Sequence, residues 1–299
     1  METAVPSPSA IDRITRLRTR AQAGLRAFYV PLLVFAAMLF VVGGWYSFRQ
    51  LGVTPEQLRL VPLALLVATG PVTLLYSGFG LYLMSRSVGT AMTLPRAVTL
   101  STYANLAEAL PLPGGAIVRT GALVASGAGL RTSSVLVVLS AVLWIAIACL
   151  GCGLALVAHG HPAALPLALI GFSGSGLATG WLVARAGWRN ALLTVGHRIV
   201  GMILISARLH LAFLVLGQAL PLADALPFAL ANVAGSAASI APAGLGISEL
   251  LAAGVASTVA VPAAAAFLAV GIDRLVALAS SGLYALAVMA ISGKDGARP

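Results

Sequence analysis

The sequence predicts an all-α polytopic membrane protein with about six full membrane spans and two re-entrant broken segments arranged as an inverted repeat. Composition is the first observation behind this prediction. Of the 299 residues, 60% are hydrophobic and only 9% are charged, and the mean hydropathy is +1.00, whereas about 25% of the residues of a soluble domain are charged. The other two observations are a set of long apolar runs and a pair of Gly/Pro-rich breaks between them.

The apolar runs have the length that a bilayer requires, because about 20 helical residues with a rise of about 1.5 Å cover a hydrocarbon core of about 30 Å. They are residues 29–48, 60–84, 133–158, 163–184, 199–220 and 264–291. Residues 1–28 are basic, with apolar residues at helical spacing, and predict an amphipathic helix on the cytoplasmic membrane surface. We expect residues 29–292 to form one transmembrane domain and residues 293–299 a cytoplasmic tail.

Basic residues predict the orientation, because Lys and Arg gather in cytoplasmic loops. The arginines between Arg13 and Arg26 place the N-terminus inside, and Lys294 places the C-terminus there. The same scheme puts the other basic clusters inside, except Arg49 and Arg59. The excess of Arg over Lys indicates a bacterial protein, so the predicted location is the bacterial inner membrane with both termini cytoplasmic.

Two broken segments, residues 93–130 and 225–262, lie between spans, and Pro113 and Pro242 mark matching breaks in them. The orientation scheme makes the first segment enter and leave on the inner side and the second on the outer side. Each segment and its flanking spans therefore form one unit of an inverted repeat, as in many transporters. Each segment is alternatively a pair of short full spans, with unchanged side assignments.

The candidate substrate-binding residues belong to these breaks or are charged residues within the spans. A bilayer offers no water to an interrupted backbone or an isolated charge, so such residues are expected to pair or to line a cavity. They are Asn105, Glu108, Pro113, Gly114, Gly115 and Arg119 in the first break, Asn232, Pro242, Gly244, Gly246 and Glu249 in the second, and Arg208, Asp273 and Arg274 in the spans.

A helix is expected to begin after the glycines that precede Arg119, and helix N-termini present free N–H groups. Together with Arg119, this helix N-terminus predicts an anion-binding site. Alternatively, Arg119 reaches the cytoplasmic surface. Glu249, at the matching place, is expected to pair with Arg119, take up a coupling proton, contact a cationic head group or stabilise a helix dipole. The adjacent Asp273 and Arg274 point in different directions on a helix. They are expected to find different partners, such as Arg208 or Glu249.

Other residues are interpreted as structural. Cys149 and Cys152 form a C-x-x-C pair deep in an apolar run, where packing is favoured over redox or metal chemistry. Gly176 and Gly180 form a small-xxx-small pair, which is typical of close helix packing. The sequence has no P-loop, dinucleotide, zinc-protease or nucleophile-elbow motif, and no cofactor is predicted.

Two stretches resemble a known family. N-L-A-E-A-L-P-L-P-G-G-A-I-V-R-T-G-A-L resembles the first signature of the lysylphosphatidylglycerol synthase transmembrane, or flippase-like, family. S-I-A-P-A-G-L-G-I-S-E resembles its second, usually written P-G-G-L-G-x-x-E, with Ala243 in place of the usual first Gly. The resemblance covers roughly Val61 to Ile291 and carries the family's polar site over to Arg119 and Glu249. The soluble synthase domain of some relatives is not expected here.

The resemblance implies a lipid flippase or transporter that moves an anionic or polyprenyl-phosphate-type lipid between leaflets. The alternatives are an intramembrane enzyme on lipid-linked substrates, or a partner that presents lipid to a separate synthase or glycosyltransferase. The expected partners are a membrane lipid substrate, anionic lipid head groups and such a separate enzyme. The net charge of +10 is interpreted as head-group contact, and no nucleic acid is expected. No oligomeric state is predicted.

Overall fold

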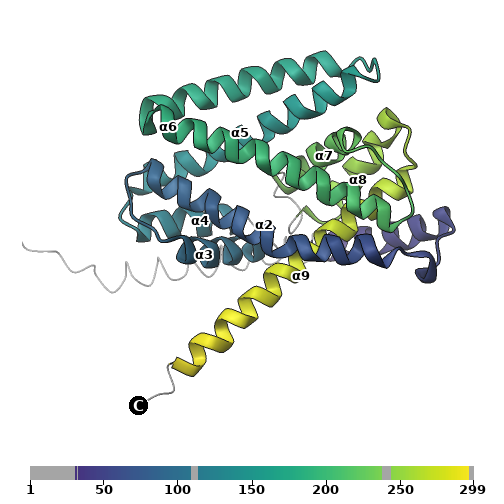
Figure 1. Cartoon of the computed structure of the whole chain (residues 1–299), viewed down its shortest axis with the longest axis horizontal. Coiled ribbons are helices and arrows are strands. Elements are labelled where there is room, and N and C mark those ends of the chain that lie inside the picture. The colour runs from purple at the N-terminus through teal and green to yellow at the C-terminus, as the bar shows by residue number, and fades with distance from the viewer. Residues whose placement is uncertain (1–30, 32, 109–113, 238–243, 296–299) are drawn as a thin grey trace, which may run out of the picture.

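The computed structural model describes residues 31, 33–108, 114–237 and 244–295. Throughout these residues the regular structure is helical, with no β-strand (Figure 1). Among the described residues, five helices are long and apolar enough to cross a membrane, which indicates a multi-pass membrane protein. They are Leu33–Leu51, α2 (Leu60–Ser87), α5 (Leu130–Val157), α6 (Ala164–Val215) and the part Ala263–Ile291 of α9 (Ala263–Asp295).

Helix α6 contains two of the six predicted spans, 163–184 and 199–220, in one element. The residues between these runs stay helical instead of forming a loop, and the chain reverses at one residue, Gly187, with φ 79° and ψ 159°. Figure 1 shows α6 folding back at its left-hand end. Each arm of α6 exceeds the roughly 20 residues that span a bilayer, so this element has room for both predicted runs, one on each side of Gly187.

The two predicted breaks contain pairs of short helices. The first holds α3 (Leu94–Ala107) and α4 (Gly114–Ala125), and the second holds α7 (Leu226–Ala237) and α8 (Ile247–Val255). The longest of these has 14 residues, or about 21 Å at the helical rise, which is shorter than a hydrocarbon core of about 30 Å. α3 packs against α4 and α7 against α8. The short 3₁₀ turns η1 (Pro55–Gln57), η2 (Ala223–Ala225) and η4 (Ala256–Val259) complete the connections.

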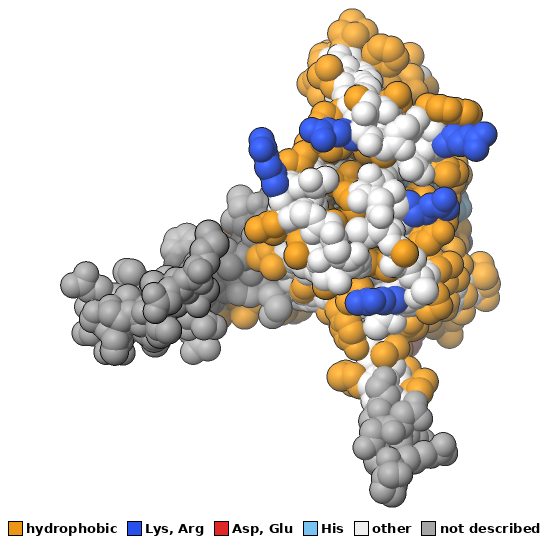
Figure 2. Space-filling model, turned by 90° about the vertical axis from the view of Figure 1, so that its left-hand side faces the viewer, with side chains coloured by type: hydrophobic (Ala, Val, Ile, Leu, Met, Phe, Trp, Pro, Cys, Tyr) orange, Lys and Arg blue, Asp and Glu red, His pale blue; other side chains and the backbone are white. Residues whose placement is uncertain are grey.

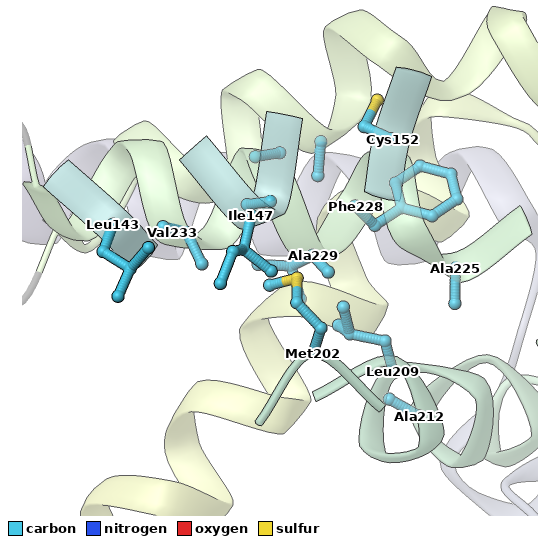
Figure 3. Packing of buried hydrophobic residues seen from close by; sticks show 14 of the residues in the cluster. Leu143, Ile147, Cys152, Met202, Leu209, Ala212, Ala225, Phe228, Ala229 and Val233 are labelled. Atoms are coloured by element: carbon cyan, nitrogen blue, oxygen red, sulfur yellow. The ribbon is translucent and has the colours of Figure 1, made fainter. Parts of the chain in front are cut away.

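The apolar core lies where α5, the second arm of α6 and α7 meet (Figure 3). Phe213 of α6 and Phe228 of α7 are fully buried, with ring centroids 4.9 Å apart. Cys152 of α5 points into the same core, and both it and Cys149 are free and buried. These cysteines therefore pack as apolar side chains. Among the described residues, no three His, Cys, Asp or Glu side chains gather to hold a metal ion.

Glycines let α5 and the first arm of α6 touch, but they are not the predicted pair. A Cβ built on Gly153 would lie 2.5 Å from the backbone nitrogen of Ala168, and one on Gly171 would lie 2.3 Å from that of Leu150. Within the described part of the chain, nothing lies within 4 Å of a Cβ on Gly176 or Gly180. The packing predicted at that pair is wrong, because it faces away from α5.

Basic side chains are spread over one end of the bundle. Figure 2 shows this face, which is the left-hand side of Figure 1, with Lys and Arg side chains in view and no Asp or Glu. The last turn of α2 carries Arg86, the first turn of α5 carries Arg131, and Arg189 follows the α6 reversal at Gly187. This is the charge distribution typical of a cytoplasmic end.

Replacing Gly187 by Ala is expected to lower the free energy of unfolding by about 1–3 kcal/mol, because its dihedral angles belong to a region that glycine alone adopts readily. Gly180→Ala is the matched control on the same helix, where helix propensity favours Ala by up to about 1 kcal/mol. Denaturant titration in mixed micelles, followed by circular dichroism, measures both. An equal effect of the two substitutions would contradict the role of Gly187 as the reversal point.

Candidate functional site

Three predicted residues of the first break come together. Arg119 on α4 lies with Nη1 2.8 Å from Oε1 of Glu108, and its Nη2 donates to Oδ1 of Asn105 at 2.9 Å. Asn105 in turn bonds to Ser77 of α2 at 3.3 Å. The Arg119 side chain is 25% exposed and that of Glu108 39%. This arrangement ties the break to α2 and leaves the ion pair accessible, and it does not join Arg119 to Glu249.

The glycines at the start of α4 permit this contact. A Cβ on Gly114 would lie 2.1 Å from the carbonyl oxygen of Ala107, and one on Gly115 would lie 2.5 Å from Cγ of Glu108. Any larger residue would separate α4 from α3. The anion beside Arg119 and the α4 N-terminus is therefore the protein's own carboxylate, Glu108. Pro113 lies outside the described residues.

The second break leads to a buried acid. Gly244 and Gly246 have φ of 65° and 80°, and Gly246 directly precedes α8. Glu249 in the first turn of α8 is completely buried, and neither carboxylate oxygen has a hydrogen-bond partner among the described residues. Its ion-pair partner is Arg274, at 3.9 Å from Nη1 to Oε1. The positive end of α8 also stabilises this acid. Pro242 lies outside the described residues.

Asp273 binds Arg208 of α6, as one of the expected partners. Nε of Arg208 lies 2.8 Å from Oδ1 of Asp273, and Nη2 donates to the backbone oxygen of the same residue at 3.0 Å. Nη1 donates to Thr69 and Thr73 of α2 at 2.9 and 3.1 Å. Asn232 of α7 donates to Oδ2 of Asp273 at 3.4 Å. This pair is almost fully buried and has donors and acceptors from four helices, so it is a structural tie.

Arg274 takes a different partner from Asp273, as expected for adjacent residues. Its Nη2 donates to Ser236 of α7 at 2.7 Å, while Nη1 faces Glu249 without a hydrogen bond. Arg274 also interacts electrostatically with Glu108 of the first break. Arg274 therefore contacts the second break directly and acts on the first break only through its charge.

Sequence reasoning missed Arg198, which it assigned to a cytoplasmic loop. The second arm of α6 begins directly after Gly187 and carries Arg198 into the bundle. There Arg198 donates to Ser140 of α5 and lies over the ring of Trp144, 5.2 Å from the centroid. Its Nε has no hydrogen-bond partner among the described residues, and its charge acts on that of Arg119. The one available signal was the apolar sequence between Arg189 and Arg198, which contains no turn-forming pair.

We call these charged residues the central cluster. It consists of Arg119, Arg198, Arg208, Arg274, Glu108, Glu249 and Asp273. The four cations outnumber the three carboxylates, and two guanidinium N–H groups lack acceptors in the described structure. Because isolated charges are costly within a bilayer, a cluster with surplus positive charge is suited to receive an anion.

Comparison with known proteins adds no identification. No protein-family model and no curated protein matches the sequence. The flippase-like family therefore stays a prediction that depends on the two motif stretches, and Arg119 of the first and Glu249 of the second both lie in the central cluster.

Removing one partner of the Arg208–Asp273 pair is expected to lower the free energy of unfolding by about 3–5 kcal/mol, because the remaining charge stays buried and unpaired. Arg208→Met and Asp273→Leu should each show this loss, measured by denaturant titration in mixed micelles. The double variant should recover most of the stability of the wild type. Additive losses in the double variant would show that the two residues act independently.

Proposed function

We propose that the protein is a lipid transporter that moves an anionic, phosphate-bearing lipid between the leaflets of a bacterial inner membrane. The observation that carries the proposal is the central cluster: two helix breaks, together with charged residues of α6 and α9, place four cations and three carboxylates in the middle of an apolar bundle. Such breaks and charges persist in membrane proteins where they serve a substrate or an ion. A phosphate head group supplies the negative charge that the cluster lacks.

The order of the helices supports the proposal. A long helix, two short helices and another long helix follow in α2, α3, α4 and α5, and again in the second arm of α6, α7, α8 and α9. We infer that the two sets form an inverted repeat with re-entrant pairs, both termini being cytoplasmic. Transporters built this way bind substrate between the repeats and alternate access by moving one against the other.

The ion pair of Arg119 is the proposed contact for the head group. Glu108 holds Arg119 in the structure, but both side chains are partly exposed and therefore exchangeable. A phosphate that approaches Arg119 meets the charge of Arg198 as well, and the unused N–H group of Arg274 lies on the side of the second break. The lipid chains stay in the bilayer, so only the head group crosses the bundle.

Replacing Arg119 by Ala is expected to reduce lipid movement at least tenfold, because it removes the cation that the first break contributes to the central cluster. Proteoliposomes that contain a nitrobenzoxadiazole-labelled phosphatidylglycerol report the movement through the fraction of label that dithionite bleaches. Arg131→Ala is the matched control, since this arginine is exposed at the start of α5 and outside the cluster.

Two outcomes would contradict the proposal. Equal transport by the Arg119→Ala and wild-type proteins would remove Arg119 from the substrate path. No lipid movement by the folded wild-type protein would favour the reading as a lipid-presenting partner. Conversion of the lipid into a new product by the purified protein would favour an intramembrane enzyme instead.

A further inference from the structure

A second feature lies outside the central cluster, on the outer surface between α2 and the second arm of α6. A groove of about 880 Å³ is lined there almost entirely by apolar side chains. Its lining consists of Val72, Leu75, Tyr76, Phe79, Leu94, Trp188, Arg189, Leu192, Leu193, Gly196, His197 and Val200. More than half of the surface of Leu75, Leu192 and Val200 is exposed. In a multi-pass membrane protein, such a surface faces lipid.

The groove has a polar end. A smaller hollow of about 400 Å³ shares Trp188, Arg189 and Leu193 with it and adds Arg86 and Asn190. Arg86 and Arg189 are exposed, and neither has a carboxylate partner among the described residues. Two cations that lie over aromatic rings, Arg86 over Tyr82 and Arg189 over Trp188, and that have no carboxylate partner in the described structure thus stand at the polar end of the groove.

We propose that this groove binds one anionic phospholipid, with its phosphate between Arg86 and Arg189 and one hydrocarbon chain along α2 and α6. The lining residues of α6 extend from Trp188 to Val200, which is about 18 Å of helix. This is comparable with half of a hydrocarbon core of about 30 Å. One chain of a lipid in the adjacent leaflet therefore fits the length of the groove.

Charge favours a phospholipid over two other occupants of the groove, the N-terminal segment 1–28 and a second copy of the chain. The N-terminal segment 1–28 carries five of the arginines, from Arg13 to Arg26, and would bring positive charge against Arg86 and Arg189. A second copy docked through the same groove would bring two further arginines to the same place. A phosphate supplies the opposite charge, and a hydrocarbon chain matches the apolar lining.

The groove also lies next to the central cluster. Its inner wall is formed by Tyr76 and His197, whose rings stack 4.0 Å apart and nearly parallel, with His197 hydrogen-bonded to the backbone oxygen of Tyr76. His197 directly precedes Arg198 in the second arm of α6, so this wall adjoins a residue of the central cluster. The inference thus deepens the proposed function, on which it rests for the substrate's path, by assigning an anionic phospholipid as substrate and this groove as its docking site.

Gly196 provides the test of the groove. A Cβ on it would have no atom within 4 Å, so Gly196→Leu fills the groove without a clash in the described structure. Gly180→Leu makes the same change on the other arm of α6, also in open space and away from the groove. Native mass spectrometry of the full-length protein in detergent, titrated with palmitoyl-oleoyl phosphatidylglycerol or phosphatidylcholine, measures binding and oligomeric state together.

We expect the wild-type and Gly180→Leu proteins to bind one phosphatidylglycerol in preference to phosphatidylcholine, and Gly196→Leu to bind it at least tenfold more weakly. Arg86→Gln/Arg189→Gln should weaken it about 30-fold, since each arginine near an anionic head group contributes about fivefold. Circular dichroism melting verifies that each variant is folded.

Equal phosphatidylglycerol binding by the two leucine variants would overturn the proposal and show annular lipid only. Loss of a dimer in Gly196→Leu, with lipid binding intact, would assign the groove to a second copy and would also overturn it. The proposed function is tested separately from the docking site, by transport in proteoliposomes. A wild-type protein that binds phosphatidylglycerol in the groove but does not move it in proteoliposomes would leave the docking site standing without transport.

Discussion

The structure depends on one buried guanidinium, that of Arg208. Its donors reach two threonines of α2 and both the carboxylate and the backbone of Asp273 on α9. In an apolar surrounding there is no water to take over these bonds, so the three helices can separate only by exposing a charge to hydrocarbon. Directional polar contacts thus fix relative positions that apolar packing against lipid leaves loosely specified.

The other charged pairs of the central cluster have fewer hydrogen-bond partners in the described structure or are more exposed. Arg274 has one good hydrogen bond and one N–H group without a partner, and Glu249 is buried with its cation 3.9 Å away. Arg119 and Glu108 form a short ion pair but remain partly exposed. A single cluster thus contains a rigid tie at one end and exchangeable contacts at the other. Proteins tolerate incomplete satisfaction of this kind mainly at functional sites.

Composition and apolar run length were sufficient to predict the helical membrane class, because a bilayer requires long apolar helices. The positions of the breaks were also predictable from Gly and Pro. The short connection within α6 was not predictable, since the basic residues between its two apolar runs resemble a loop, whereas a single glycine is enough to reverse the chain and the residues on both sides of it are helical. Arg198 was missed for the same reason.

Pairing within the site was only partly predictable. Adjacent residues on a helix diverge, which correctly separated the partners of Asp273 and Arg274. The partner of Glu249 among the available cations depends on how the two breaks approach each other. The close approach of helices at Gly153 and Gly171 rather than at Gly176 and Gly180 likewise depends on which helix face is turned inward, and a spacing rule alone carries no such information.

The second arm of α6 connects the groove with the central cluster. It begins after the reversal at Gly187 and includes the anchored Arg208, and between them it carries both groove-lining residues and Arg198. Arg198 lies about 15 Å along the helix from Arg208, so a tilt of roughly 10° about that anchor displaces it by about 3 Å. If α6 moves away from α2 at the lipid-facing side, Arg198 of the central cluster therefore moves with it.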